Sequence, residues 1–142
     1  MTSAISGPPR RICFDQHHND GVLTVYPEGD GGVPFCIRRV FTIVGVSANG
    51  RRGKHAHRRC SQLHACLAGR VDVEITNGTK EVIESLSANG TALLIPPMLW
   101  SSIVFEGPST VLAVFCDALY DETDYIRDWD EYVRLKRAAP EF

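Results

Sequence analysis

The sequence has no strong excess of charge of either sign. Charged residues make up 23% of its 142 positions, and the formal net charge is only -2. A protein that binds nucleic acid or an anionic membrane through its overall field carries a clear positive excess. We therefore expect no nucleic acid and no membrane surface as partners, and any charge that matters for function should act locally.

The sequence also has no long apolar run. No stretch approaches the ~18 consecutive apolar residues of a membrane-spanning helix. Residues 1–12 lack the basic start, apolar middle and small-residue cleavage site of a secretory signal. We therefore expect a cytoplasmic protein. Serine, glycine and proline dominate residues 1–12, which are predicted to form a flexible N-terminal segment.

Cysteine pairs with the spacing of redox or zinc motifs are missing. The five cysteines are odd in number and scattered, and none of them forms a C-x-x-C pair. They are Cys13, Cys36, Cys60, Cys66 and Cys116. This usage predicts buried thiols in a reducing compartment, with neither a disulfide framework nor a zinc site.

Short runs rich in β-branched and aromatic residues, separated by turn residues, make up most of the chain and predict an all-β fold. The length suits one domain, which we assign to residues 13–142. The predicted strands are Val22–Tyr26, Arg38–Val46, Ser61–Ala68, Arg70–Thr76, Lys80–Ser85, Ala92–Ile95, Trp100–Phe105 and Thr110–Phe115. This number and spacing of strands favours a sandwich or jelly roll, a β-barrel whose mouth can hold a ligand.

Two local patterns refine the prediction. Asn77-Gly78 lies between two predicted strands and predicts a hairpin with a type I′ turn, which needs positive φ at both central positions. Charged and large apolar residues recur at offsets of three and four between Asp121 and Arg137. That period predicts one or two short amphipathic helices that dock on the barrel.

The most informative motif is His55-Ala56-His57, because an H-x-H on a strand aims both imidazoles at one side of the sheet. Three explanations are open. The histidines could be structural, since an inward histidine is often a bonded core residue. They could bind a metal. They could also carry out acid/base chemistry without a metal, since an imidazole takes and returns protons near neutral pH.

The metal explanation can be tested on the spacing. The segment through His55, His57, Gln62 and Gly69 resembles the first cupin motif, and Gly90 through Pro96 to Ser101 resembles the second. In cupins the position of Gln62 is acidic and that of Ser101 is a histidine. A neutral amide and a hydroxyl replace those ligands here, so we predict no bound metal and no cofactor.

A closer resemblance rests on several segments together: Pro34–Phe41, Arg52–His57, Cys66–Gly69, Pro97 with Trp100, and Tyr120-Asp121-Glu122-Thr123-Asp124-Tyr125-Ile126-Arg127. With these segments the chain resembles the sugar nucleotide 3,4-ketoisomerases, WxcM-like cupins that act on dTDP-4-keto-6-deoxyglucose. The resemblance runs from about Gly21 to Tyr132. It implies a cupin jelly roll, a short helical tail and a homodimer with exchanged N-terminal strands.

The resemblance also implies an activity and its residues. A base removes the C3 proton of a dTDP-linked 4-keto-6-deoxyhexose, an enediol forms, and a proton delivered to C4 leaves the ketone at C3. His55 is expected to be the base and His57 to relay or position the proton. Arg52, Arg39, Gln62 and Trp100 are the predicted substrate-binding residues. The product would feed an aminotransferase in deoxyamino-sugar biosynthesis, for example for lipopolysaccharide O-antigen.

Three positions depart from the family pattern. Phe41 replaces a tyrosine, Asp20 precedes Gly21 where relatives carry arginine, and Ser101 follows Trp100 where relatives often carry histidine. These departures keep two alternatives open. One is a metal-dependent cupin enzyme, and the other is a cupin that binds a sugar nucleotide without turnover.

Overall fold

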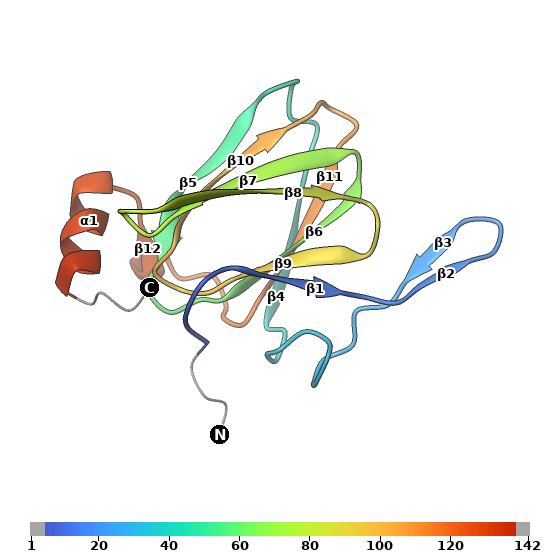
Figure 1. Cartoon of the computed structure of the whole chain (residues 1–142), viewed down its shortest axis with the longest axis horizontal. Coiled ribbons are helices and arrows are strands. Elements are labelled where there is room, and N and C mark those ends of the chain that lie inside the picture. The colour runs from blue at the N-terminus through green and yellow to red at the C-terminus, as the bar shows by residue number, and fades with distance from the viewer. Residues whose placement is uncertain (1–4, 139–142) are drawn as a thin grey trace.

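The computed structural model describes residues 5–138, which form two facing antiparallel sheets (Figure 1). The first sheet has the order β1-β9-β6-β11-β4 and the second the order β12-β5-β10-β7-β8. The strands of the first are Arg10–Cys13 (β1), Thr91–Ile95 (β9), Gln62–Ala68 (β6), Val111–Cys116 (β11) and Arg39–Val44 (β4). Those of the second are Tyr125–Ile126 (β12), Arg51–His57 (β5), Trp100–Phe105 (β10), Arg70–Thr76 (β7) and Glu81–Ser87 (β8).

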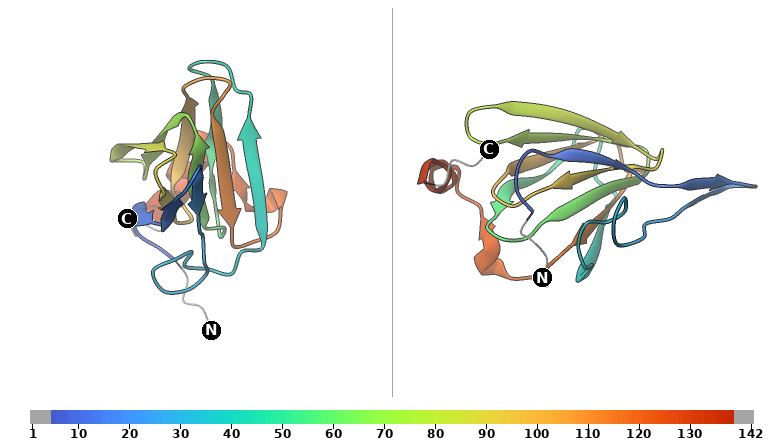
Figure 2. Two further views of the ribbon diagram at one scale, coloured as in Figure 1. Left: turned by 90° about the vertical axis from the view of Figure 1, so that its right-hand side faces the viewer. Right: turned by 60° about the horizontal axis from the view of Figure 1, so that its bottom comes forward.

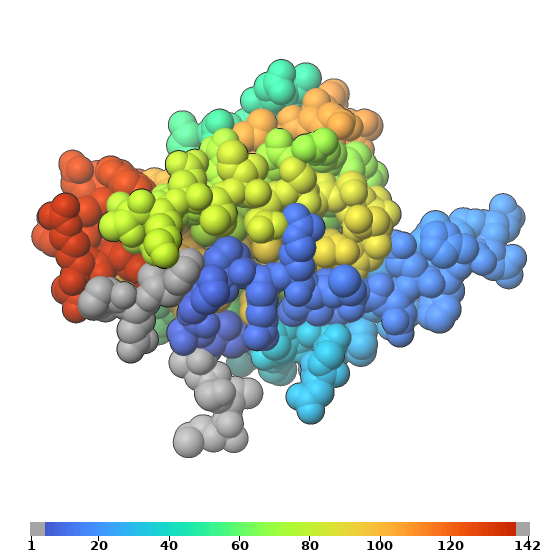
Figure 3. Space-filling model, in the orientation of Figure 1, coloured from blue at the N-terminus to red at the C-terminus, as the bar shows by residue number. Residues whose placement is uncertain are grey.

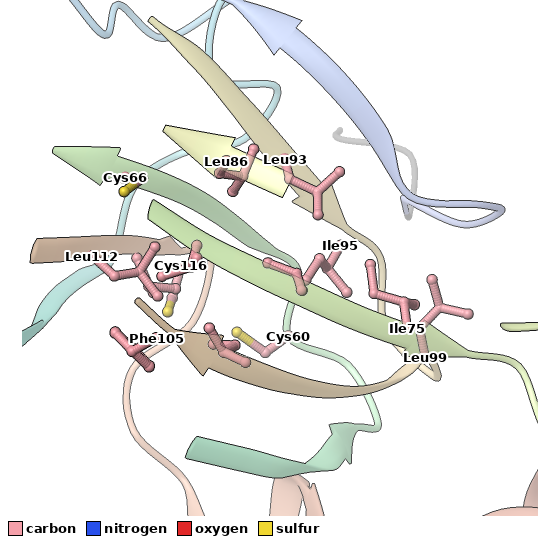
Figure 4. Close-up of a cluster of buried hydrophobic side chains, with 14 residues drawn as sticks. Cys60, Cys66, Ile75, Leu86, Leu93, Ile95, Leu99, Phe105, Leu112 and Cys116 are labelled. Carbon is pink, nitrogen blue, oxygen red and sulfur yellow. The ribbon is translucent and has the colours of Figure 1, made fainter. Parts of the chain in front are cut away.

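The predicted jelly roll is confirmed, and strand β7 shows why the two sheets face one another. Val71, Val73 and Ile75 are buried, whereas Asp72 and Glu74 between them are more exposed. This period of two gives each strand one apolar face. The apolar faces meet between the sheets in a cluster that includes Phe105, Leu112, Cys60 and Cys116 (Figure 4).

A second cluster covers the outer face of the first sheet. Val33 and Phe35, from the segment before β4, pack there with Leu63 of β6 and Leu94 of β9. Strands β6 and β9 are therefore buried on both faces, which leaves little room for polar side chains along them.

The hairpin predicted at Asn77-Gly78 joins β7 to β8, but the predicted type I′ turn is wrong. The loop spans residues 77–80, and of its two central positions only Gly78 has a positive φ, at 97°. The side-chain oxygen of Asn77 accepts hydrogen bonds from the backbone N–H groups of Thr79 at 3.0 Å and Lys80 at 2.8 Å. The asparagine therefore organises a longer loop through its side chain.

The N-terminal part contains strands that the sequence pattern did not predict. Residues 1–4 of the predicted flexible segment lie outside the described residues. The prediction was wrong for residues 10–12, because they belong to β1, which pairs with β9. After β1 comes a two-stranded hairpin of Gln16–His18 (β2) and Val22–Thr24 (β3), which projects away from both sheets (Figures 1 and 3).

The C-terminal part forms a 3-10 turn at Glu122–Asp124, strand β12 and helix α1 at Trp129–Ala138. The predicted helical tail is thus confirmed only from residue 129. Figure 2 shows α1 at the opposite end of the molecule from the projecting hairpin. Its Tyr132 is fully buried, and the hydroxyl shares its one proton between the backbone oxygens of Met98 at 2.9 Å and Thr76 at 3.1 Å. Within residues 5–138, no helix has both the length and the apolar character needed to cross a membrane.

Candidate active site

Strand β5 places both histidines between the sheets. His55 pairs in register with Ser101 of β10, whose other neighbour is the buried Ile75. The register between β5 and β10 then shifts, since Ser102 pairs with Gly53 and Lys54 is an extra residue. Gly53 and Lys54 have φ angles of 103° and 65°. This bulge offsets the alternation of side chains along β5, so that His55 and His57 face inward. In a strand without the bulge, Arg52 and His55 could not both keep their present positions.

His57 is held by a buried carboxylate. Its Nδ1 lies 3.0 Å from Oδ2 of Asp124. The same carboxylate accepts from the backbone N–H of Arg59 through Oδ1 at 2.7 Å and from that of Cys60 through Oδ2 at 3.3 Å. Because a carboxylate only accepts, Nδ1 of His57 carries the proton. Burial lowers the pKa of His57, Asp124 opposes that shift, and the charge of Arg39 adds to it.

Gln62 bridges two histidines. Its amide nitrogen lies 3.2 Å from Nε2 of His57, and its amide oxygen lies 3.1 Å from Nε2 of His64. The residue is only 5% exposed. With both ends of the amide bonded inside the protein, this position does not support the predicted substrate contact of Gln62.

His55 packs against His57 and Tyr125 through its ring. Its ring lies 5.1 Å from that of His57 and 5.0 Å from that of Tyr125, measured between centroids. Its buried Nδ1 has no hydrogen-bond partner among the described residues. Burial, then the charges of His57 and Arg127, lower the pKa of His55 to about 4. The imidazole is therefore neutral at pH 7 and can accept a proton.

Two arginines give this region a positive field. The guanidinium of Arg39 lies 3.5 Å from Sγ of Cys116 and 5.5 Å from the ring centroid of Phe41. That of Arg127 lies 4.3 Å from the ring centroid of Tyr125 and is paired with Glu122 at 2.8 Å. The charges of both arginines lower the pKa of His57, so their positive field reaches the region around the histidines.

Cys116 adds a thiol that the sequence did not single out. Its Sγ contacts Arg39 and lies 3.8 Å from the amide nitrogen of Gln62. A hydrogen bond from Cys60, and then Arg39, lower the pKa of Cys116 to about 7. All five cysteines are free, as predicted, but Cys13 and Cys36 are exposed, so the prediction of buried thiols was wrong for those two.

Among the described residues, neither Arg52 nor Trp100 forms a hydrogen bond or ring contact with His55 or His57. Arg52 is exposed at the start of β5, before the bulge, and among the described residues its guanidinium forms no ion pair. Trp100 lies on the outer face of β10, where its ring contacts Trp129 and Tyr132. It lines a pocket of about 350 Å³ there. The structure thus does not support a substrate contact of Trp100 beside His55.

The residues that sequence reasoning missed are Asp124, Tyr125 and Arg127. They belong to the Tyr120–Arg127 block, which carried the family resemblance but was assigned only a structural role at a helix start. Strand β12 brings the block to the site by pairing Tyr125 with His57. The signal available was the cluster of a carboxylate, a phenol and a guanidinium within four residues.

One group of side chains has the composition of a metal site. Nδ1 of His57, Sγ of Cys60 and a carboxylate oxygen of Asp124 lie within 4.8 Å of one another. However, Nδ1 of His57 donates to Asp124, and the same carboxylate accepts two backbone N–H groups. A cation would have to replace these bonds, so the donor set fits a hydrogen-bonded cluster better than a metal site.

Comparison with known proteins adds independent findings. A family model described as "FdtA: WxcM-like, C-terminal" matches residues 11–137. A curated TDP-4-oxo-6-deoxy-α-D-glucose-3,4-oxoisomerase from Aneurinibacillus thermoaerophilus is 31% identical over 105 residues, which cover 74% of this chain and 76% of the relative.

Solved structures agree with that match. The sugar 3,4-ketoisomerase QdtA from Thermoanaerobacterium thermosaccharolyticum, in complex with TDP, superposes with a TM-score of 0.87 at 31% identity and covers 92% of this chain and 96% of its own. A His-to-Asn mutant of the same enzyme, in complex with TDP-4-keto-6-deoxyglucose, gives a TM-score of 0.86 at 31% identity, over 91% of this chain and 94% of its own.

Proposed function

The chain belongs to the WxcM-like FdtA family, and from this premise we propose that it is a sugar nucleotide 3,4-ketoisomerase. The enzyme moves the keto group of dTDP-4-keto-6-deoxyglucose from C4 to C3 through an enediol. The family match and the relatives, which are named as 3,4-ketoisomerases, support this activity. The observation in this chain that carries it is the neutral imidazole of His55, which packs against His57, the histidine held by the carboxylate of Asp124.

His55 is the proposed general base. It takes the C3 proton of the substrate, and the electron pair of the C3–H bond forms the C3–C4 double bond while negative charge moves to O4. The proton of O3 then passes to O4, the electron pair of the O3–H bond forms the C3–O double bond, and the electron pair of the C3–C4 double bond takes a proton at C4, which places the ketone at C3 and a hydroxyl at C4. A general base must be unprotonated before it takes a proton, and the lowered pKa of His55 keeps its imidazole neutral at pH 7.

Arg39 and Arg127 are proposed to stabilise the enediolate. The positive field that lowers the pKa of the histidines also lowers the energy of a negative charge that forms beside them. Guanidinium groups also form charge-assisted hydrogen bonds, which are the strong ones. Arg127 takes here the role that the sequence assigned to Arg52.

His57 is proposed to position His55 and not to contact the substrate. It is 7% exposed, and both of its ring nitrogens are bonded, one to Asp124 and the other to Gln62. We also propose that the reaction needs no metal. His57 and Gln62 stand at cupin metal-ligand positions, but here they are bonded to each other.

We also propose a homodimer in which hairpin β2–β3 packs against a second copy. Val22, Leu23 and Val25 are 56%, 62% and 40% exposed on this projecting hairpin. Three apolar side chains at the tip of an arm favour a contact with another protein surface. Light scattering tests the proposal: Leu23→Asp should shift the molar mass from two chains toward one, and a monomeric wild-type protein would contradict it.

The proposed setting is the cytoplasm, in the biosynthesis of a deoxyamino sugar such as one of the O-antigen. The five free cysteines are compatible with a reducing compartment. A 3-keto product requires an aminotransferase as the next enzyme, because transamination converts that ketone into the 3-amino group.

A coupled assay tests the activity. The protein is incubated with dTDP-4-keto-6-deoxyglucose and a 3-aminotransferase with its amino donor, and the nucleotide product is identified by NMR. We expect a 3-amino-3,6-dideoxyhexose, and the NMR spectrum also gives its configuration at C4. Recovery of unchanged substrate by a protein that binds dTDP would instead support the non-catalytic alternative.

A further inference from the structure

His64 is a polar side chain in an apolar part of the core. It lies on β6, where its register neighbours are Leu93 of β9 and Val114 of β11. It is 2% exposed. Its Nε2 bonds to Gln62, but its Nδ1 is buried and has no partner among the described residues. A histidine that leaves one nitrogen unsatisfied is a poor choice for packing alone, so a second reason for its presence is needed.

Three hydrogen bonds link His64 to Asp124 through Gln62 and His57. Asp124 bonds to His57, His57 to Gln62, and Gln62 to His64, at 3.0, 3.2 and 3.1 Å. This series of hydrogen bonds begins at the 3-10 turn before β12, continues to β5 and ends on β6. His55, the proposed base, lies beside its second member, with 5.1 Å between ring centroids.

The position of each proton in this series of hydrogen bonds follows from the acceptor at its first member, Asp124. Asp124 accepts, so Nδ1 of His57 is protonated, and Nε2 of a neutral His57 must accept. The amide nitrogen of Gln62 therefore donates to His57, and its oxygen is left to accept from His64. His64 consequently carries its proton on Nε2, which leaves Nδ1 as the bare, unpartnered nitrogen that is observed.

We propose that His64 is a positioning residue: through Gln62 it holds His57 in the neutral tautomer with the proton on Nδ1. The inference rests on the proposed function in that it explains how His55 stays an effective base. Without a donor at position 64, the Gln62 amide is free to turn over and present its oxygen to Nε2 of His57. His57 would then bind a second proton and become a cation beside His55.

A cationic His57 would weaken the base. The charges that face His57 are Asp124 from the 3-10 turn, Arg39 from β4 and Arg127 after β12, with His55 on its own strand. Another positive charge among them would oppose the arrival of a proton on His55, because like charges disfavour protonation. His64 therefore acts on the reaction without touching the substrate.

NMR of ¹⁵N-histidine-labelled protein tests the proposal without turnover. Two-bond ¹H–¹⁵N spectra distinguish the two neutral tautomers and the imidazolium of each histidine. In the wild-type protein at pH 7 we expect His57 protonated on Nδ1 and His64 on Nε2. His64→Leu should convert His57 to the imidazolium, and His64→Gln, whose amide can donate to Gln62 in place of Nε2, should restore the neutral form.

Gln62→Glu gives the same test in a protein that keeps His64. Its carboxylate accepts from Nε2 of His57, so His57 should become an imidazolium even if His64→Leu does not fold. His64→Leu and Gln62→Glu, in which His57 is charged, should both lose at least about tenfold in kcat with KM little changed. This is the result expected when a proton-transfer step is impaired. A neutral His57 in a folded His64→Leu variant would overturn the proposal, and if that variant does not fold, a neutral His57 in Gln62→Glu would do so. Normal NMR tautomers in an inactive wild-type protein would instead count against the proposed function.

Discussion

Nδ1 of His57 lies 3.0 Å from Oδ2 of Asp124, a residue 67 positions later in the chain. This bond joins the H-x-H strand to the Tyr120–Arg127 block and makes the two family segments parts of one site. It also fixes which nitrogen of His57 carries a proton, and all further hydrogen bonds toward Gln62 and His64 depend on that choice.

Asp124→Asn should therefore reduce activity more than binding. An asparagine can present its NH₂ group to His57, and the Nδ1–H donor would then have no acceptor. We expect kcat to fall by about 10²-fold or more, since loss of a correctly held proton carrier removes most of its contribution. Binding of dTDP should stay within about 1.4 kcal/mol of wild type, as measured by calorimetry.

Asp121→Asn is the matched control. Asp121 caps the same 3-10 turn by accepting from the backbone N–H of Thr123 at 3.0 Å, and asparagine caps equally well. This exposed variant should retain wild-type kcat. If both variants lose activity alike, the effect of Asp124 comes from the shape of the turn and not from its bond to His57.

Arg39 and Arg52 give contrasting predictions. Arg39→Met removes a charge beside the histidines, so the pKa of His57 should rise and kcat/KM should fall by about 10²-fold, a loss typical of a residue that stabilises developing charge. Arg52→Met removes an exposed charge before the bulge and should cost less than about threefold, as most surface substitutions do. Steady-state kinetics compare the two. A larger loss for Arg52 would return it to the substrate site that its sequence position indicates.

Stability should decline in weak acid because of the buried histidines. The pKa of His64 is lowered to about 3 and that of His55 to about 4, whereas histidine in an unfolded chain titrates near 6.5. Between these values the unfolded state binds more protons, so the free energy of unfolding falls as pH falls from about 6.5 to 4, by about 1.4 kcal/mol per pH unit for each such histidine.

His64→Leu should reduce the slope of the free energy of unfolding against pH by the contribution of at least one proton, about 1.4 kcal/mol per pH unit. Urea unfolding at several pH values across this window measures it, with His17→Leu as the control for loss of an exposed imidazole. A slope for His64→Leu equal to that of wild type would mean that His64 is already protonated in the folded protein, which is incompatible with its Nδ1 being bare.

Removal of metal should leave the reaction unchanged. The amide of Gln62 and Nε2 of His57 are bonded to each other, and neutral oxygen ligands hold iron, manganese or zinc weakly. We expect dialysis against a chelator to leave kcat at its starting value and elemental analysis to find well below one metal ion per chain. Stoichiometric iron or manganese whose removal abolishes turnover would contradict the account.

The sequence predicted the fold well where residues alternate strictly. Strand β7 begins and ends at the predicted residues, because its apolar positions recur with a period of two. It failed at β1 and β2, whose arginines, glutamine and histidines carry no such pattern. The pairing of β1 also depends on β9, a strand far away in the chain, which local composition does not encode.

The site was predicted in part for a similar reason. His55, His57 and Arg39 were found from their position in motifs, and the structure brings them together. Asp124 and Arg127 were assigned to a helix start, because no local rule shows that β12 folds back onto β5. The outward position of Trp100 was not predicted, because the sequence of β10 does not show which of its side chains face inward.

Hydrogen exchange at the sugar carbons tests the central claim most directly. The protein is incubated in D₂O with dTDP-4-keto-6-deoxyglucose, and NMR follows deuterium at C3 and C4. Wild type should incorporate deuterium as the ketone moves. His55→Asn should abolish incorporation while dTDP affinity changes by less than about tenfold, or 1.4 kcal/mol. Undiminished exchange by His55→Asn, or no exchange by a wild-type protein that binds the substrate, would contradict the account.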